Sequence, residues 1–289
     1  YRRHLLPPLF VRTHCILWNL MSRLHLHILG SGSKGNCALI EGPQGLIMVD
    51  DGLSRRETLK RMAELGLSVD DVYALVVTHE HSDHIKGLEV WCKHWNGPVF
   101  SSRGTLTSKE SLAHLPVEEF DPGDALSIAG VHIQTYSTSH DVVNPVGYRF
   151  DAQGDSIGFA TDTGELSKHA IDTLKDCRIL ALESNHDVTM LRQGDYPRFL
   201  QERILSVKGH LSNDQAADAA RALATDRTEQ LIAMHISQDN NRPSLTVKSY
   251  ASSLDATLDN ELGSTATRVE GLHKLTIRPA GQYRPMTIQ

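Results

Sequence analysis

A run of metal-ligand side chains within six residues constrains this sequence more than any other feature. Residues 79–84 read His-Glu-His-Ser-Asp-His and directly follow the apolar segment 73–77. A strand that ends in a tight loop can direct imidazoles and a carboxylate at one point, and zinc and related divalent ions accept these ligand types. An exposed polar loop would rarely combine these residues at this spacing. The motif therefore predicts a metal site whose first ligands are His79, His81, Asp83 and His84.

Strand and helix patterns alternate along the chain and predict an α/β fold. Leu24, Leu26 and Ile28 alternate with polar residues, as in a half-buried strand. Ser54 and Ser212 each begin a capping-box pattern, so we expect helices after them. Further strands are expected near 37–41, 45–50, 73–77, 98–101, 124–128, 131–136, 147–151, 156–161, 178–182, 230–236 and 274–278. Further helices are expected near 85–95, 103–113, 167–175, 197–207 and 246–258. This order favours mixed sheets with helices packed outside, in one domain over residues 21–289.

The first twenty residues differ from the rest of the chain. Their short apolar stretch is interrupted by Pro7, Pro8 and Arg12, so it is too broken for a membrane span and does not resemble a signal peptide. We interpret residues 1–20 as a disordered or artefactual extension and expect translation to begin at Met21. No other stretch could cross a membrane, and the four cysteines form no Cys-x-x-Cys pair. We therefore expect a cytoplasmic protein with reduced thiols.

The net charge of −6 argues against a protein that binds nucleic acid mainly through a basic face. A polyanionic partner would have to be attracted locally, and bound metal cations could do this.

Four ligands in one run cannot complete two metal sites, and the rest of the chain resembles the metallo-β-lactamase superfamily from Met21 onward. His140, Asp162 and His235 each follow an expected strand and match the superfamily's further metal residues. Asp50, in Asp-Asp-Gly, matches an aspartate of the superfamily that accepts a hydrogen bond from the outer N–H of a metal-binding imidazole and so fixes its orientation. The resemblance implies the four-layer αββα fold with two mixed β-sheets. It also implies that His79, His81 and His140 hold one metal, that Asp83, His84 and His235 hold the other, and that Asp162 bridges them.

Such a pair of divalent ions would share a water molecule, lower its pKa and present hydroxide as the nucleophile. Asp83 is then placed to orient the hydroxide or receive its proton. No Gly-x-Ser-x-Gly elbow is present to indicate a serine nucleophile.

Three features favour a phosphodiester substrate. His210 lies just before the helix capped by Ser212, where it could bind a phosphate oxygen or protonate a leaving group. The glycine-rich loop 31–36 could cradle a phosphate, with Ser33 and Asn36 as contacts. Segments 31–37, 183–187, 209–213 and 235–241 resemble the YycJ/WalJ branch of the superfamily. That resemblance implies a zinc- or manganese-dependent exonuclease that acts 5′ to 3′ on double-stranded DNA.

Two alternatives stay open at this point. One is a small-molecule metallohydrolase acting on a cyclic phosphodiester, thioester or lactone, and the other is a non-catalytic regulatory module on the same fold. The oligomeric state is not indicated. The remaining histidines have no ligand pattern, and we expect surface or packed positions for them, with His186 near the site but not a ligand. They include His25, His27, His94, His114, His132, His169 and His273.

Overall fold

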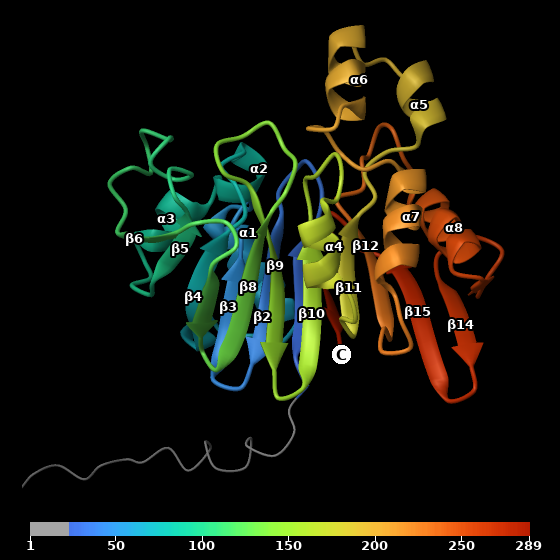
Figure 1. The fold of residues 1–289 in the computed structure, drawn as a ribbon. Coiled ribbons are helices and arrows are strands. Elements are labelled where there is room, and N and C mark those ends of the chain that lie inside the picture. Colours follow the sequence, from blue (N-terminus) through green and yellow to red (C-terminus); the bar gives the residue numbers. More distant parts are fainter. Residues whose placement is uncertain (1–22) are drawn as a thin grey trace, which may run out of the picture.

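Two β-sheets packed face to face form the centre of the structure, a computed structural model that describes residues 23–289 (Figure 1). The expected extension 1–20 and the start at Met21 lie outside the described residues. Among the residues from 23 onward, no helix is long and apolar enough to cross a membrane.

The first sheet has seven strands and is antiparallel at one side and parallel at the other. In spatial order they are β16 (Met286–Ile288), β1 (His25–Gly30), β2 (Cys37–Gly42), β3 (Gly45–Val49), β4 (Val72–Val77), β5 (Val99–Ser102) and β6 (Val117–Phe120). Strands from β16 to β3 pair antiparallel, whereas β3, β4, β5 and β6 pair parallel. The parallel part places the carboxyl ends of β3 and β4 at one edge of the sheet.

The second sheet has nine strands and is also mixed. In spatial order they are β13 (Thr257–Leu258), β14 (Ala266–Glu270), β15 (His273–Pro279), β12 (Gln230–Met234), β11 (Ile179–Glu183), β10 (Asp155–Ala160), β9 (Val146–Ala152), β8 (Val131–Ser137) and β7 (Ala125–Ile128). Strands β10, β11, β12 and β15 run parallel, so the loops after β10, β11 and β12 meet at one end.

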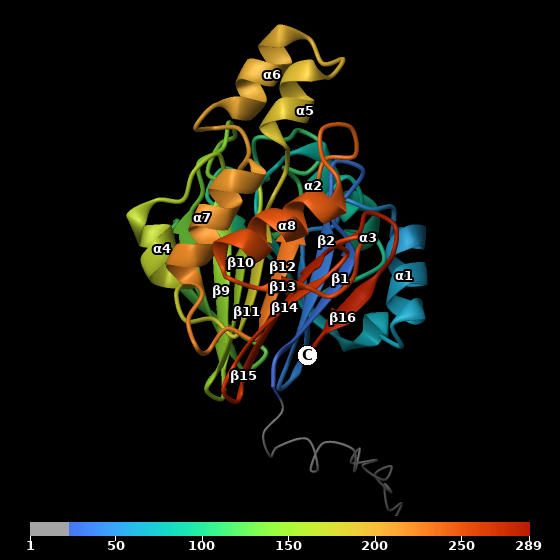
Figure 2. The same ribbon diagram turned by 90° about the vertical axis from the view of Figure 1, so that its right-hand side faces the viewer.

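Helices cover the outer face of each sheet. Against the first sheet lie α1 (Arg55–Glu64), α2 (Ser82–Ile85) and α3 (Leu88–Cys92), with a short 3-10 turn at Val69–Asp71. Against the second lie α4 (Lys168–Leu174), α7 (Asn213–Leu223) and α8 (Pro243–Ser253). Helices α5 (Val188–Gln193) and α6 (Arg198–Leu205) form a hairpin that projects beyond the rest of the molecule (Figure 2).

Three buried hydrophobic clusters separate these layers. The central one fills the space between the sheets, with Ile40 and Val76 from the first and Phe150 and Ile157 from the second. A second cluster lies between the second sheet and its helices, and a third between the first sheet and its helices. The order helix, sheet, sheet, helix confirms the predicted four-layer αββα fold.

Only some of the predicted helices and helix caps are found in the structure. Ser212 forms the predicted capping box, but Ser54 forms only half of one, because the side chain of Glu57 pairs with Arg61 instead. The helix expected over 85–95 is divided into α2 and α3. The helix expected over 103–113 is wrong: this segment forms turns, with Gly104 at φ +82° and serine and threonine hydroxyls bonded to nearby groups. Such local side-chain bonds compete with helix formation.

Candidate metal centre

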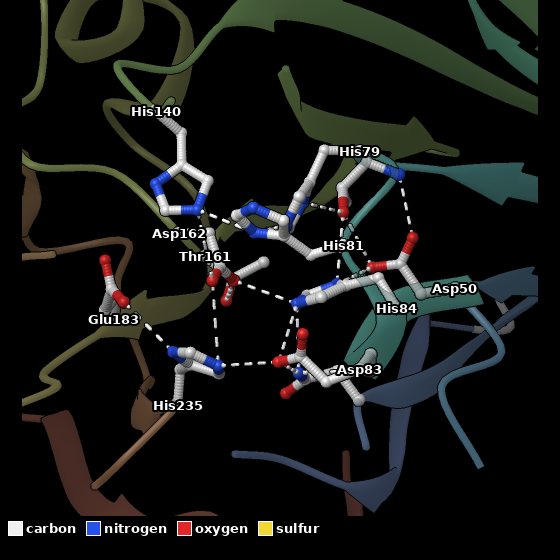
Figure 3. Close-up of polar contacts among 12 residues, drawn as sticks. Asp50, His79, His81, Asp83, His84, His140, Thr161, Asp162, Glu183 and His235 are labelled. Carbon is white, nitrogen blue, oxygen red and sulfur yellow. Dashed lines mark hydrogen bonds and ion pairs between the residues drawn. The ribbon is translucent and has the colours of Figure 1, made fainter. Parts of the chain in front are cut away.

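The predicted site residues converge where strand ends of the two sheets meet (Figure 3). The first sheet contributes Asp50 after β3 and the loop 79–84 after β4. The second contributes His140 after β8, Asp162 after β10 and His235 after β12. Residues far apart in the sequence therefore form one cluster because the two sheets pack face to face.

Three imidazole nitrogens face one another in the first half of the cluster. The Nδ1 atom of His81 lies 3.2 Å from Nε2 of His79 and 3.1 Å from Nε2 of His140. The outer nitrogens have other partners: Nδ1 of His140 lies 3.1 Å from the carbonyl of Gly209, and Nδ1 of His79 lies 3.0 Å from the hydroxyl of Thr78.

An outer N–H bonded in this way leaves the inner nitrogen with its lone pair, which is the form that binds a metal. Zinc bonds to histidine of about 2.0–2.1 Å at a tetrahedral angle imply ligand nitrogens about 3.3 Å apart. The nitrogen separations around His81 fit such an ion.

Asp83, His84 and His235 form the second half of the cluster. Asp83 Oδ2 lies 3.4 Å from Nε2 of His235 and 3.6 Å from Nε2 of His84. The outer nitrogen of His84 lies 2.7 Å from Asp50 Oδ2, and that of His235 lies 3.2 Å from Glu183 Oε1. Asp50 therefore lies behind the imidazole of His84, and Glu183 holds the equivalent position behind His235.

Asp162 lies between the two halves. Its Oδ2 atom is 3.2 Å from Nε2 of His84, while its Oδ1 atom is 3.6 Å from Nε2 of His235 and 3.9 Å from Nε2 of His140. Thr161 donates a hydrogen bond of 2.6 Å to the same carboxylate. One carboxylate that faces both groups has the geometry expected of a bridging ligand.

Three of these residues have an uncommon backbone conformation. Asp50, Asp162 and His235 have φ values of +60°, +52° and +51°, in the left-handed region that residues other than glycine seldom adopt. Asp50 and His235 are the first residues after β3 and β12, and Asp162 is the second residue after β10. Such strain is frequent at functional sites, where the surrounding structure maintains it. Here it turns the chain out of the strand and places the side chain in the cluster.

The charge of the site favours cations. Five carboxylates lie within ion-pair distance of its imidazoles, and within residues 23–289 only one of them, Asp141, pairs with an arginine, Arg203; the other four are Asp50, Asp83, Asp162 and Glu183. Buried charges need compensation, and two divalent cations would balance four carboxylates if the imidazoles are neutral.

The pKa shifts agree with this balance. Burial lowers the pKa of His79 well below its ordinary value, which favours the neutral, metal-binding ring. Burial also lowers the pKa of His235, but the charge of Asp162 and hydrogen bonds to Asp83 and Glu183 outweigh it, and the pKa of His235 is raised to about 10. The carboxylates thus stabilise positive charge in this half of the cluster.

His210 lies at the open side of the cluster. Its Nδ1 atom is 2.6 Å from Glu183 Oε1, and its ring stacks on His235 with centroids 5.2 Å apart. The side chain is 18% exposed, whereas those of His84 and His235 are buried. A substrate could therefore reach His210 from solvent.

The two substrate-binding residues predicted in the glycine-rich loop, Ser33 and Asn36, lie in different surroundings. Ser33 is exposed. Asn36 is buried, with Nδ2 3.2 Å from Asp83 Oδ2 and 3.0 Å from Nε2 of His84, and its Oδ1 accepts from the backbone N–H of Gly32. Asn36 therefore lies against two proposed ligands and is better placed to position them than to bind substrate.

Sequence reasoning missed Glu183. This carboxylate is fully buried and contacts both His210 and His235. Burial raises its pKa, but the charge and hydrogen bonds of the two histidines outweigh this and lower the pKa of Glu183 to about 2. An acidic residue at the end of an apolar strand was the available signal. His186, three residues later, is buried and belongs to none of the ligand groups within the described residues.

A cavity of about 550 Å³ opens beside His235. Its lining includes Ile236, Gln238, Arg242, Tyr283 and Ser31. Ser31 also accepts the backbone N–H of His235 through its hydroxyl, so this cavity adjoins the cluster.

The fold and the convergent ligand residues define a class of metal-dependent hydrolases, and comparison with known proteins agrees. Residues 46–236 match the family model described as the beta-lactamase superfamily domain, and the chain belongs to that superfamily. It is 36% identical to exodeoxyribonuclease YycJ of Bacillus anthracis over 236 residues, covering 80% of this chain and 89% of that protein. It is 34% identical to exodeoxyribonuclease WalJ of Streptococcus pneumoniae over 220 residues, covering 74% of this chain and 82% of that protein.

A solved structure shows the same fold. The metallo-beta-lactamase fold protein YhfI from Bacillus subtilis superposes with a TM-score of 0.65 at 13% identity, covering 92% of this chain and 100% of that chain. The chain is therefore a metal-dependent hydrolase with a divalent metal requirement, as the sequence predicted.

Proposed function

We propose that this protein is a dinuclear metal-dependent phosphodiesterase that acts on nucleic acid, and specifically a 5′–3′ exonuclease on double-stranded DNA. The observation that carries the proposal is the pair of donor groups facing each other across Asp162. The substrate class is supported by similarity to exodeoxyribonucleases over most of both chains.

The proposed ligand sets follow the two halves of the cluster. His79, His81 and His140 hold one ion, and Asp83, His84 and His235 hold the other, with Asp162 between them. Their imidazole-rich donors suit zinc, and manganese is the second candidate. When bound, two such ions lower the pKa of water and neutralise charge on the phosphoryl oxygens.

The protein side chains orient the reaction. Asp83 is 21% exposed, so its carboxylate can accept the proton of the attacking water. Glu183 accepts a hydrogen bond from Nδ1–H of His210, so in the imidazolium form of this ring Nε2–H is free to donate a proton or a hydrogen bond to a substrate oxygen. With chromosomal DNA as the substrate, we place the enzyme in the cytoplasm.

Metal analysis combined with a substrate panel tests this proposal. The panel contains 5′-phosphorylated duplex DNA, RNA, a cyclic phosphodiester and an acyl thioester. We expect duplex DNA to be degraded from the 5′ end, chelation to abolish turnover, and zinc or manganese to restore it. In Asp162→Ala, bound metal and activity should be lost together.

Several outcomes would contradict the proposal. Full activity after stringent chelation would exclude the metal mechanism. Hydrolysis of the thioester with none of any phosphodiester would identify a different hydrolase, and metal binding without hydrolysis of any substrate would identify a regulatory protein.

A further inference from the structure

A second histidine cluster lies on the first sheet, away from the candidate metal centre. His25 and His27 come from β1, and Glu41 comes from β2, where it lies directly opposite His25 in the antiparallel register. Leu26 and Ile28 of β1 pack between the two sheets, so the alternating histidines face the opposite side. His25 and His27 lie at the beginning of β1 and Glu41 near the end of β2, whereas the candidate centre adjoins the loop that follows β1.

The donor atoms of this cluster converge on one carboxylate oxygen. Glu41 Oε2 is 2.9 Å from Nδ1 of His25 and 3.1 Å from Nε2 of His27, and the three donor atoms all lie within 4.8 Å of one another. The two imidazole rings meet nearly at right angles, at 86°. They therefore approach the carboxylate from different directions, as ligands of one ion do.

Thr287 of β16 fixes the ring of His27. Its hydroxyl lies 2.9 Å from Nδ1 of His27. A hydroxyl can donate or accept a hydrogen bond. Thr287 can therefore accept a hydrogen bond from Nδ1–H of His27, and the lone pair of Nε2 then faces Glu41. A metal-ligating histidine is usually held in this way through its other nitrogen.

Access and charge also permit an ion at this position. The side chains of His25 and Glu41 are 29% and 25% exposed, while that of His27 is only 4% exposed. Within the described part of the chain, Glu41 forms no ion pair with lysine or arginine. An ion could enter from solvent and bind against one buried, oriented imidazole.

We propose that His25, His27 and Glu41 form a third divalent metal site, with zinc as the ion. Two histidines and a glutamate with an open fourth position are an established zinc ligand set. Binding replaces the protons shared between these groups, so zinc uptake releases protons. The ion links β1 to β2 and, through Thr287, supports the pairing of β1 with β16.

Zinc titration of the metal-free full chain tests the site. We compare the wild type with Glu41→Gln and His25→Ala, which alter partly exposed side chains, and with His132→Ala, which removes an exposed strand histidine elsewhere. Each site variant should bind one zinc equivalent fewer than the wild type, while His132→Ala binds the same number. The test compares the number of zinc ions bound by the wild type and by each variant. Its result therefore does not depend on how many ions the candidate metal centre binds.

Stability and activity give two further readouts. Zinc should raise the thermal unfolding midpoint of the wild type more than that of Glu41→Gln. The hydrolytic activity of Glu41→Gln should equal that of the wild type. Equal zinc stoichiometry in the wild type and both site variants would overturn the proposal. So would binding weaker than about 1 mM, because such an ion would not be retained.

Discussion

At the residue scale, the centre depends on side chains that each have one defined partner behind them. Asp50 stands behind His84, Glu183 behind His235, and the Gly209 carbonyl behind His140. This outer layer selects which imidazole nitrogen faces inward. Glu183 differs from the others because it also holds His210, so one carboxylate connects a proposed ligand with the proposed proton donor.

His210→Ala separates catalysis from metal binding. Because His210 is outside the proposed ligand sets, the variant should retain its metal and lose about 10²- to 10⁴-fold in turnover of phosphodiesters. Metal content and kcat are measured on the same preparation, with His169→Ala, an exposed histidine on α4, as the control. A fully active His210→Ala protein would show that the assigned role is wrong.

At the element scale, we expect the hairpin of α5 and α6 to contact substrates that are long enough to reach it. Its base is fixed to the loop of His140, since Ser139 donates to the carbonyl of Val207 and Arg203 pairs with Asp141. Residues 188–208 contain four basic and two acidic side chains, so the hairpin is positive on a chain of net charge −6. Phe199 on α6 is 72% exposed.

Phe199→Ala should therefore weaken the interaction with long substrates. A base stacked on an aromatic ring contributes about 1–3 kcal/mol, so we expect KM for duplex DNA to rise about tenfold. Turnover of a small chromogenic phosphodiester, which does not reach the hairpin, should be unchanged. Leu272→Ala, at a fully exposed apolar residue in the turn between β14 and β15, is the matched control. Equal effects on both substrates would contradict a role in binding DNA.

Sequence patterns predicted elements well where a strand or helix has its own apolar periodicity. They failed over 103–113, where serine, threonine and Gly104 favour turns, and they missed helix α5 and the strands β6, β13, β14 and β16. The run 79–84 was found from its own residue pattern, and His140, Asp162 and His235 were found from the superfamily resemblance together with their positions near strand ends. Glu183 and the pairing of His25 with Glu41 were not, since both depend on which strands lie side by side.

At the scale of the whole molecule, Asp155 and Arg178 join the two sheets. The Arg178 guanidinium donates to Asp155 at 2.6 and 2.7 Å and to the carbonyl of Leu24, while Asp155 also accepts the Leu24 N–H. Leu24 immediately precedes β1, so this network connects the first sheet with β10 and β11 of the second.

Asp155→Asn should destabilise the protein by about 3 kcal/mol at neutral pH, because it leaves a nearly buried arginine with only the more distant carboxylate of Glu229, 3.8 Å away. Burial raises the pKa of Asp155, but the hydrogen bonds and charge of Arg178 outweigh this, and the pKa lies below its ordinary value. The stabilisation is therefore complete above about pH 4 and is lost as the pH falls further. Urea unfolding at neutral and acidic pH measures it; a difference independent of pH would refute the assignment.

The bridging position of Asp162 has a consequence for how the enzyme matures. Each proposed ion takes ligands from both sheets, and His235 is the last of them to leave the ribosome. A nascent chain that ends before this histidine carries an incomplete ligand set and lacks β13, β14 and β15 of the second sheet. Loading of both proposed sites must therefore follow the docking of the two sheets, so partly synthesised or cleaved chains should have no hydrolytic activity.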